Sequence, residues 1–285
     1  MPKTKTSPVK TRTAALAGAS PAKVKARGKV PDPAERGDDT AQHAVKTLGK
    51  ALNLLEAVAT FPHPPTVSEL ALGIGVSRPT AYRLVQTLVA ADFLQQDPND
   101  ARLTIGLAVL PLASSLLDRN RLRLGAMPHL QALAQKMNAR VNLGILYRQQ
   151  VLLLAGAEKP NLPTIYSRFG RAIPLHASGL GKAILAWLPP ERATALLEAN
   201  QMTARTPNTI TTMAAMRREL AAIRARGFAT ENAESTPTSS CIAAAILDAN
   251  GFPVGAVSAS GRSLEAIMGE AAQVVGAAEL ISHLL

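Results

Sequence analysis

The chain has 285 residues, a length typical of two domains rather than one. Hydrophobic residues make up 47%, enough to bury sizeable cores, and no apolar run approaches the roughly 20 residues that cross a bilayer. The single cysteine, Cys241, excludes an intrachain disulfide framework and suits a reducing compartment. We therefore expect a cytoplasmic protein with no membrane partner.

The net charge of +11 indicates an anionic partner, but the charge distribution does not locate the binding domain. Residues 1–40 contribute +5 and residues 106–140 contribute +4, whereas residues 41–105 carry no net charge. Residues 1–42 lack a sustained apolar period, so we predict a disordered basic arm there.

Ordered structure is predicted to begin at Val45, with two helices. Apolar residues recur at three- and four-residue steps from Val45 to Ala59, including Leu48, Leu52, Leu55 and Val58, as on one face of a helix that "FPHPP" ends. A second, short helix follows, with Thr66 or Ser68 as its N-cap and Glu69 in its first turn. Gly75 in "GIGV" suits a tight turn.

A third helix begins after Ser77, its predicted N-cap, and has Pro79 in its first turn, where a missing N–H costs nothing. At 100° per residue, its apolar residues gather on one side. The opposite side has hydroxyls, an amide and arginines, with no acid until Asp92. Such side chains contact phosphates and base edges. The apolar side comprises Ala81, Leu84, Val85 and Leu88; the polar side comprises Pro79, Thr80, Arg83, Gln86 and Thr87, flanked by Arg78 and Tyr82.

The segment "DFLQQDPNDARLTI" predicts a β-hairpin with its turn at "DPND". Three helices and a hairpin make an all-α winged helix-turn-helix with a β-hairpin wing, here over residues 43–106, whose third helix would enter the major groove of double-stranded DNA. The competing interpretation is a generic three-helix core in a scaffold that does not bind DNA. The candidate DNA-binding residues are Ser77, Arg78, Pro79, Thr80, Tyr82, Arg83, Gln86, Thr87 and, on the wing, Arg102.

Residues 107–124 are predicted to be a linker helix within a longer helical stretch, interrupted at Pro111 and again near Gly125 to Pro128. Residues 125–285 alternate strand-like and helical segments. They include paired strands around "YRQQ", a hairpin at "SCIAAAILDANGFPVGAVSASG" and a closing amphipathic helix. This order predicts an α+β domain with a mostly antiparallel sheet.

With both halves considered, the chain resembles IclR-type bacterial transcription regulators over about residues 44–285. The most specific block is "RAIPLHASGLGKAILAWLP", which is similar to that family's effector-domain signature. "TPNTIT", "RARGFATENAE", "SCIAAAILD" and "GAVSASG" surround it in the family's order, and "SRPTAYRLVQTLVAADFL" stands in the first half. The sequence departs from the family at "LTIG", where Tyr-Arg-Leu-Gly is common, and in having Glu231 and Glu234 after "GFA".

The resemblance implies a GAF-like effector-binding domain and a homodimer, often paired into a homotetramer, on a palindromic operator. It also implies a small-molecule effector, often an organic or aromatic acid, and no cofactor. Carried over by position, it places Gly179, Leu180, Glu231, Cys241, Ser258 and Ser260 in the effector pocket.

Elementary chemistry agrees with part of this pocket. Ser258 and Ser260, two apart on a strand, point to the same side, and backbone N–H groups at "ASGLGKA" suit a carboxylate. Glu231 suits an anion less well, unless its carboxyl is protonated or accepts a bond from a ligand hydroxyl.

Other chemistries are disfavoured. "HASGLGKA" lacks the first glycine of a phosphate loop and the hydroxyl after its lysine. A cysteine-dependent hydrolase using Cys241, with His176 and Glu231, remains an alternative, although a cysteine opening an apolar strand is usually a small buried hydrophobe. The histidines show no paired ligand spacing, so neither a metal site nor a catalytic site is predicted.

Overall fold

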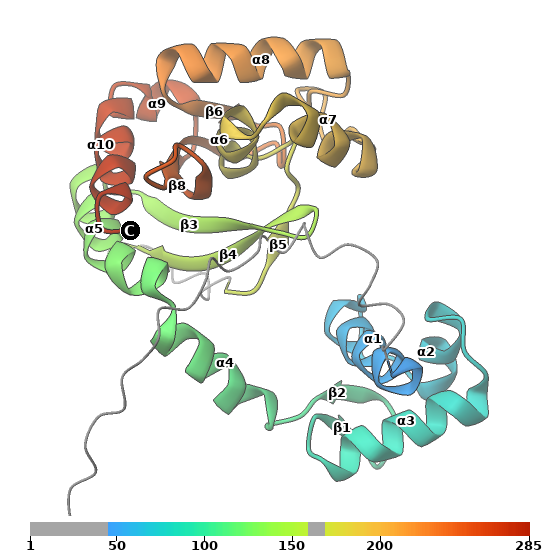
Figure 1. The fold of residues 1–285 in the computed structure, drawn as a ribbon. Coiled ribbons are helices and arrows are strands. Elements are labelled where there is room, and N and C mark those ends of the chain that lie inside the picture. The colour runs from blue at the N-terminus through green and yellow to red at the C-terminus, as the bar shows by residue number, and fades with distance from the viewer. Residues whose placement is uncertain (1–44, 159–168) are drawn as a thin grey trace, which may run out of the picture. The chain divides into compact units, whose positions relative to one another are not determined.

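The computed structural model describes residues 45–158 and 169–285, and the basic arm predicted at residues 1–42 lies outside them. The chain divides into two compact units, Met1–Ile105 and Gly106–Leu285 (Figure 1). We describe each unit by itself.

The first unit is a three-helix domain with a hairpin. Its helices are α1 (Lys46–Thr60), α2 (Val67–Gly73) and α3 (Arg78–Ala90), and the short strands β1 (Leu94–Gln96) and β2 (Leu103–Ile105) pair antiparallel. One apolar core joins all five elements, because each contributes side chains that solvent does not reach. These are Leu54, Val58, Leu70, Ala71, Ala81, Leu84, Val85, Leu94 and Leu103.

Local sequence signals set the ends of α2 and α3. Thr66 and Glu69 form a capping box, in which the Thr66 N–H donates to the Glu69 carboxylate at 2.7 Å. The N–H and hydroxyl of Thr66 hold the pKa of Glu69 below its ordinary value. Gly75 adopts a positive φ of 67° in the turn between the helices, and Ser77 caps α3.

The buried face of α1 differs from the predicted one. Val58 is buried, but Val45, Leu48 and Leu52 are each more than half exposed, and Leu54 faces the core instead. The apolar arc of α1 is wider than the surface that α2, α3 and the hairpin cover, so part of it faces solvent.

The second unit begins with α4 (Val109–Arg119) and α5 (Arg121–Met137). The interruptions predicted at Pro111 and near Pro128 are wrong, because each proline lies inside a helix. Pro111 stands in the first turn of α4, where no intrahelical N–H bond is lost. The break comes at Asn120, whose side chain accepts the N–H of Arg123 at 2.9 Å and caps α5.

A six-stranded, wholly antiparallel sheet forms the centre of the second unit, in the order β5-β4-β3-β8-β7-β6. Consecutive strands β3 and β4, and β7 and β8, form hairpins. The bounds are β3 (Arg140–Tyr147), β4 (Gln150–Ala157), β5 (Ala172–Ile173), β6 (Ala229–Asn232), β7 (Ser240–Leu247) and β8 (Pro253–Gly261).

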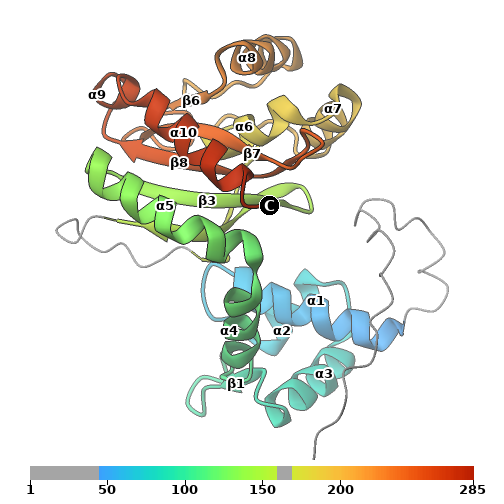
Figure 2. The ribbon, with the colours of Figure 1, turned by 60° about the vertical axis from the view of Figure 1, so that its left-hand side comes forward.

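Helices cover both faces of this sheet. One core contains residues of α5, α9 (Leu264–Met268) and α10 (Ala271–Ser282), and the other contains residues of α6 (Gly179–Trp187), α7 (Pro190–Ala199) and α8 (Met213–Arg226). Successive side chains of β7 point to opposite faces of the sheet, so Ile242 and Ala244 lie in the first core and Ala243 lies in the second. Figure 2 shows α5 and α10 in front of the strands.

The N-terminus of α6 approaches its neighbours too closely for any residue but glycine. A Cβ atom on Gly181 would lie 2.2 Å from the carbonyl oxygen of Leu175, and one on Gly179 would lie 2.6 Å from Cys241 Sγ. The two glycines therefore let the helix begin directly against β7 and the backbone before it.

Candidate DNA interface and ligand pocket

The polar side of α3 faces solvent. Its N-cap places the first turn at the surface, and the apolar residues on the opposite side anchor the helix in the core. The predicted contact residues lie along one exposed surface of the domain, with Thr80 half-buried. The exposed members are Ser77, Arg78, Pro79, Tyr82, Arg83, Gln86 and Thr87.

These side chains differ in whether they are already bonded. Ser77 and Thr80 share a hydroxyl–hydroxyl bond of 2.8 Å, and the Thr87 hydroxyl donates to the Arg83 carbonyl at 2.9 Å. Arg78 donates from Nε to Ser68 Oγ at 3.0 Å, a contact that the sequence did not indicate. In contrast, the side chains of Tyr82, Arg83 and Gln86 bond to no group among the described residues, so three adjacent polar groups on α3 are free for a ligand.

Arg102, the predicted wing residue, is bonded within its own domain. Its guanidinium donates to the Pro64 carbonyl at 2.6 Å and pairs with Asp100 at 3.4 Å and Glu69 at 3.8 Å. These contacts hold the start of β2 to the loop before α2. Because partly exposed ion pairs contribute little by themselves, their main effect is to fix the orientation of the hairpin.

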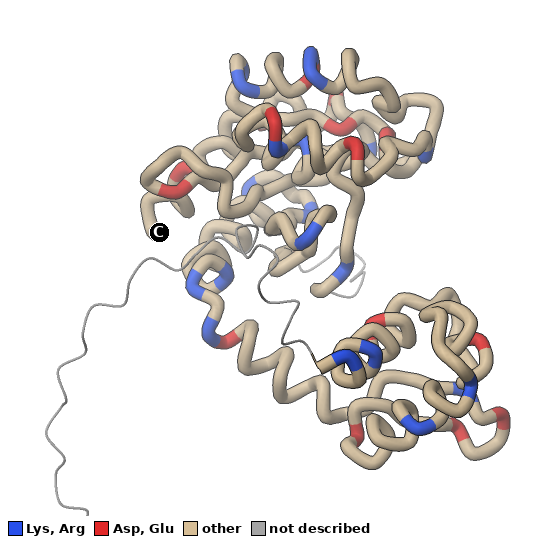
Figure 3. Tube along the Cα trace, turned by 45° about the vertical axis from the view of Figure 1, so that its right-hand side comes forward, with Lys and Arg blue, Asp and Glu red and all other residues tan. Residues whose placement is uncertain are grey.

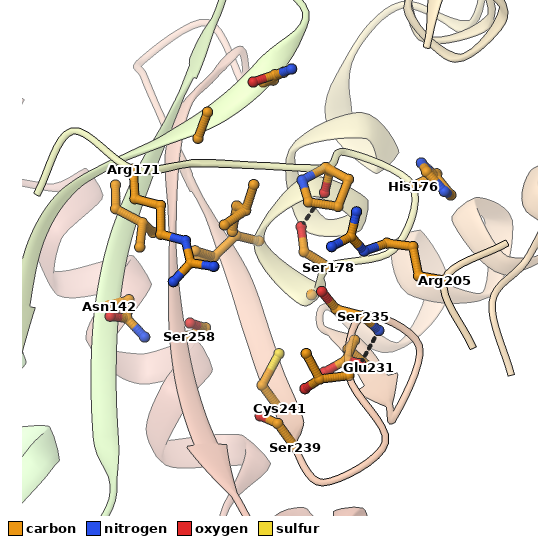
Figure 4. Close-up of a pocket in the computed structure, with 18 of the residues that line it drawn as sticks. Asn142, Arg171, His176, Ser178, Arg205, Glu231, Ser235, Ser239, Cys241 and Ser258 are labelled. Carbon is orange, nitrogen blue, oxygen red and sulfur yellow. Dashed lines mark hydrogen bonds between the residues drawn. The ribbon is translucent and has the colours of Figure 1, made fainter. Parts of the chain in front are cut away.

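The second unit contains a cavity of about 410 Å³ bounded by β3, β7, β8 and the start of α6 (Figure 4). This volume lies in the range of small-molecule sites. All six residues that the sequence placed in an effector pocket line this one cavity. They come from four elements, α6, β6, β7 and β8, and are Gly179, Leu180, Glu231, Cys241, Ser258 and Ser260.

Several further polar residues line the cavity without having been predicted as pocket residues. Arg171 precedes β5, and Arg205 lies between α7 and α8, in segments with no periodic pattern to mark a binding role. Asn142 lies opposite Ser258 in the pairing of β3 with β8. The one signal in the sequence for Arg171 was its place as the first residue of the block "RAIPLHASGLGKAILAWLP".

The N-terminus of α6 borders the cavity. Ser178 Oγ accepts the Gly181 N–H at 3.1 Å and donates to the Pro174 carbonyl at 2.6 Å, which satisfies both roles of this hydroxyl. Gly179 lies directly against the Cys241 thiol. The Leu180 N–H has no acceptor among the described residues, so it remains available to an anionic group.

Glu231 is only 4% exposed, and its carboxyl bonds to the loop that follows β6. Oε1 accepts the N–H of Glu234 at 2.5 Å and that of Ser235 at 3.0 Å. Burial raises the pKa of this carboxyl, and the two N–H bonds offset part of the rise. Oε1 of Glu231 is thus bonded to its own loop.

A buried ion pair lies behind this loop. Lys182 Nζ is 2.5 Å from Glu234 Oε1, and the two side chains are 1% and 8% exposed. The hydroxyls of Thr206 and Thr209 donate to the carbonyls of Ala233 and Glu234, each at 2.7 Å. Because α6 and residues 206–209 both bond to it, the loop after β6 has a fixed position at the edge of the cavity.

Cys241 lacks the environment of a nucleophile. Burial raises its pKa to about 12, so the thiol stays protonated at physiological pH. His176 Nε2 lies 3.0 Å from the Thr203 carbonyl oxygen, which can only accept, so this nitrogen donates and is not paired with the thiol. Among the described residues no cluster of His, Cys, Asp and Glu could hold a metal ion.

A winged helix with a free polar surface on α3, followed by a sheet domain with a polar cavity, defines a class of ligand-responsive DNA-binding regulators. None of the helices in the described part of the chain is long and apolar enough to cross a membrane.

Comparison with known proteins identifies the family of DNA-binding regulators. Residues 47–98 match the IclR helix-turn-helix domain, and residues 114–282 match the C-terminal domain of the bacterial transcriptional regulator IclR. The HTH-type transcriptional regulator BhcR of Paracoccus denitrificans is 33% identical over 220 residues, which are 77% of this chain and 78% of BhcR. The chain belongs to the IclR family of bacterial transcriptional regulators.

Solved structures show the same fold. The crystal structure of the IclR transcriptional regulator from Alicyclobacillus acidocaldarius, 23% identical, superposes with a TM-score of 0.75 over 85% of this chain and 99% of that one. An IclR homologue from Microbacterium hydrocarbonoxydans, solved with 4-hydroxybenzoate, is 25% identical, with a TM-score of 0.70 over 84% of this chain and 98% of that one.

The predicted fold class is confirmed, as is the prediction of a DNA-binding transcription regulator of the IclR family. The hydrolase alternative fails, since the relatives are regulators and not enzymes.

We predict that Lys182→Met destabilises the second unit by about 3 kcal/mol or more, because it leaves the Glu234 carboxylate buried without its cation. Chemical denaturation at pH 7 measures this change. The double variant Lys182→Met/Glu234→Leu removes both charges and should regain most of the loss. Surface substitutions ordinarily change the free energy of unfolding by no more than about 0.5 kcal/mol. A change this small for Lys182→Met alone would contradict the structural role of the pair.

Cys241, the single cysteine, should react with a thiol reagent at least about 100-fold more slowly in the native protein than in the urea-unfolded chain at pH 8. Because its pKa is raised to about 12, the native rate should keep rising with pH from 7 to 10. Stopped-flow absorbance follows both rates. A rate that levels off near pH 7 would indicate an activated thiolate and revive the hydrolase alternative.

Proposed function

We propose that this chain binds a palindromic operator as a homodimer through the polar side of α3, and that a small organic acid in the cavity of the second unit changes its affinity for that operator. The observation that carries the DNA-binding part is the set of unbonded side chains of Tyr82, Arg83 and Gln86 on the exposed side of a capped helix. The chain acts in the bacterial cytoplasm, at the nucleoid when DNA is bound.

The chemistry of these side chains suits the major groove. An arginine bonds guanine through two donors, a glutamine bonds adenine in the same paired manner, and a tyrosine hydroxyl bonds phosphate. Arg78, beside the free set, bonds Ser68 on α2, which fixes its direction. The shorter hydroxyl side chains, Ser77, Thr80 and Thr87, contribute at the edges. Arg102 holds the hairpin in place and would contact the DNA backbone only by exchanging part of its bonds to Pro64, Asp100 and Glu69.

Dimer formation is supported by α4. This helix buries none of its residues, while Leu110, Leu112 and Leu116 are each more than half exposed. Leu112 and Leu116, four residues apart, lie on one face. An apolar helix surface of this kind marks an interaction site, and a second copy matches it because a two-fold pair presents the same surface from both sides. One recognition helix reads few bases, so a palindromic operator also requires two copies.

The Microbacterium homologue binds 4-hydroxybenzoate, an aromatic acid, which supports a small acid as the effector. Gly179, Leu180, Glu231, Cys241, Ser258 and Ser260 would contact it. Such a ligand acts by binding more tightly to one arrangement of the paired DNA-binding domains than to another.

Arg83→Ala should weaken operator binding by about 10- to 100-fold, because one paired base contact contributes roughly 1–3 kcal/mol. A gel-shift titration with a duplex selected by the full-length chain from a random library measures the affinity. Arg83 is exposed and unbonded, so the unfolding midpoint should not change. Arg218→Ala on α8 removes the same charge from the other unit and is the matched control. Equal affinities for the two variants would refute the proposed interface, and weak dependence on salt would favour the scaffold alternative.

Leu112→Glu combined with Leu116→Glu should convert the dimer into a monomer, because it places four like charges where two copies of α4 meet. Sedimentation velocity gives the oligomeric state and also separates dimer from tetramer in the wild type. Leu72→Glu, the same change at a residue that is 86% exposed on α2, is the control and should leave the assembly intact. A double variant that still sediments as the wild type does would place the dimer interface elsewhere.

A further inference from the structure

Two arginines at the cavity carry no counter-charge. Arg171 and Arg205 come from segments on different sides of the pocket, and Figure 4 shows both side chains directed toward the space above Cys241 and Ser258. Neither guanidinium has a hydrogen bond or ion pair with any residue that the structure describes. Both side chains are exposed and so are solvated by water, and two positive charges directed at one cavity favour an anionic ligand.

Glu231, the one carboxylate that lines the cavity among the described residues, does not neutralise these arginines. Its Oε1 atom accepts two backbone N–H groups. The pair of Lys182 and Glu234 behind the loop is balanced within itself. The cavity lining therefore has two arginines and one carboxyl group, whose Oε1 atom is already bonded to its own loop.

The floor of the cavity offers neutral groups that bond an acid. Ser258 is 2% exposed, and its hydroxyl, which lines the cavity, has no partner among the described residues. Asn142 lies opposite it across the β3–β8 pair. With the free Leu180 N–H, these groups supply hydrogen bonds to carboxylate oxygens but no charge. The number of anionic groups on the ligand is therefore set by the two arginines.

We propose that the cavity selects a small dicarboxylate, with one carboxylate on Arg171 and the other on Arg205. This inference rests on the proposed effector role of the cavity and specifies its ligand class. Arginine bonds a carboxylate through two parallel N–H groups, which gives geometric selectivity as well as charge. Because the two guanidinium groups enter from different sides, two carboxylates joined by a short carbon chain suit them better than one compact dianion such as a phosphate ester does.

The test uses calorimetry on the full-length protein at fixed ionic strength. The probes are malonate, succinate, glutarate, adipate and phthalate, each with its monoamide, together with methyl phosphate and 4-hydroxybenzoate as compact-dianion and monoacid probes. At least one diacid should bind about tenfold more tightly than its monoamide, since the monoamide loses one charged contact. Arg171→Met and Arg205→Met should each remove that preference, and Arg218→Met, with its arginine on α8 outside the cavity lining, should not.

The inference is wrong if no diacid binds, or if diacids and their monoamides bind with equal affinity. It is also wrong if methyl phosphate or 4-hydroxybenzoate binds more tightly than every diacid. A loss of diacid preference in Arg171→Met and Arg205→Met no larger than in Arg218→Met would overturn it as well. Gel shifts with the selected duplex separate this failure from failure of the proposed function. If a monoacid changes operator affinity, the proposed effector sensing holds and only the selectivity for dicarboxylates is wrong. If no acid changes operator affinity, both proposals are wrong.

Discussion

The close approach of α6 to the backbone beside it is the constraint on which the ligand domain depends. Gly181 lies where any side chain would overlap the Leu175 carbonyl, and Gly179 lies against the thiol of Cys241. With bulkier residues the helix would have to move outward, and three features would be lost together: the free Leu180 N–H at the cavity, the buried contact of Lys182 with Glu234, and the position of the loop after β6. Two hydrogen atoms in place of side chains thus set the geometry of the pocket.

The polar side of α3 and the cavity of the second unit share one feature: each has hydrogen-bonding groups without a partner among the described residues. In folded proteins buried polar groups are nearly always satisfied and buried charges are paired, whereas exposed side chains bond to water until a ligand replaces it. On α3, neighbouring residues satisfy the hydroxyls but not the longer side chains of Tyr82, Arg83 and Gln86. In the cavity, Ser178 is satisfied twice, whereas Ser258 and two arginines are not. The missing partners are those that DNA and a small acid would supply.

Both α1 and α4 have apolar residues that face solvent. The apolar period of α1 predicted a helix correctly. The pattern did not distinguish the residues that pack inside the domain from those that stay exposed at its surface. Periodicity records which residues avoid water and not which neighbour covers them.

By itself, the sequence determined the elements and much of their ends: the N-cap at Ser77, Pro79 in the first turn, the alternating strands and the two family domains. These depend on interactions within a few residues, or on blocks of residues that keep their order. Only the tertiary structure decided that Asn120 and not a proline divides the linker helices, that Glu231 bonds its own loop, and that Arg171 and Arg205 reach one cavity. Those outcomes depend on burial and on contacts between segments far apart in the chain, and local spacing does not encode such distances.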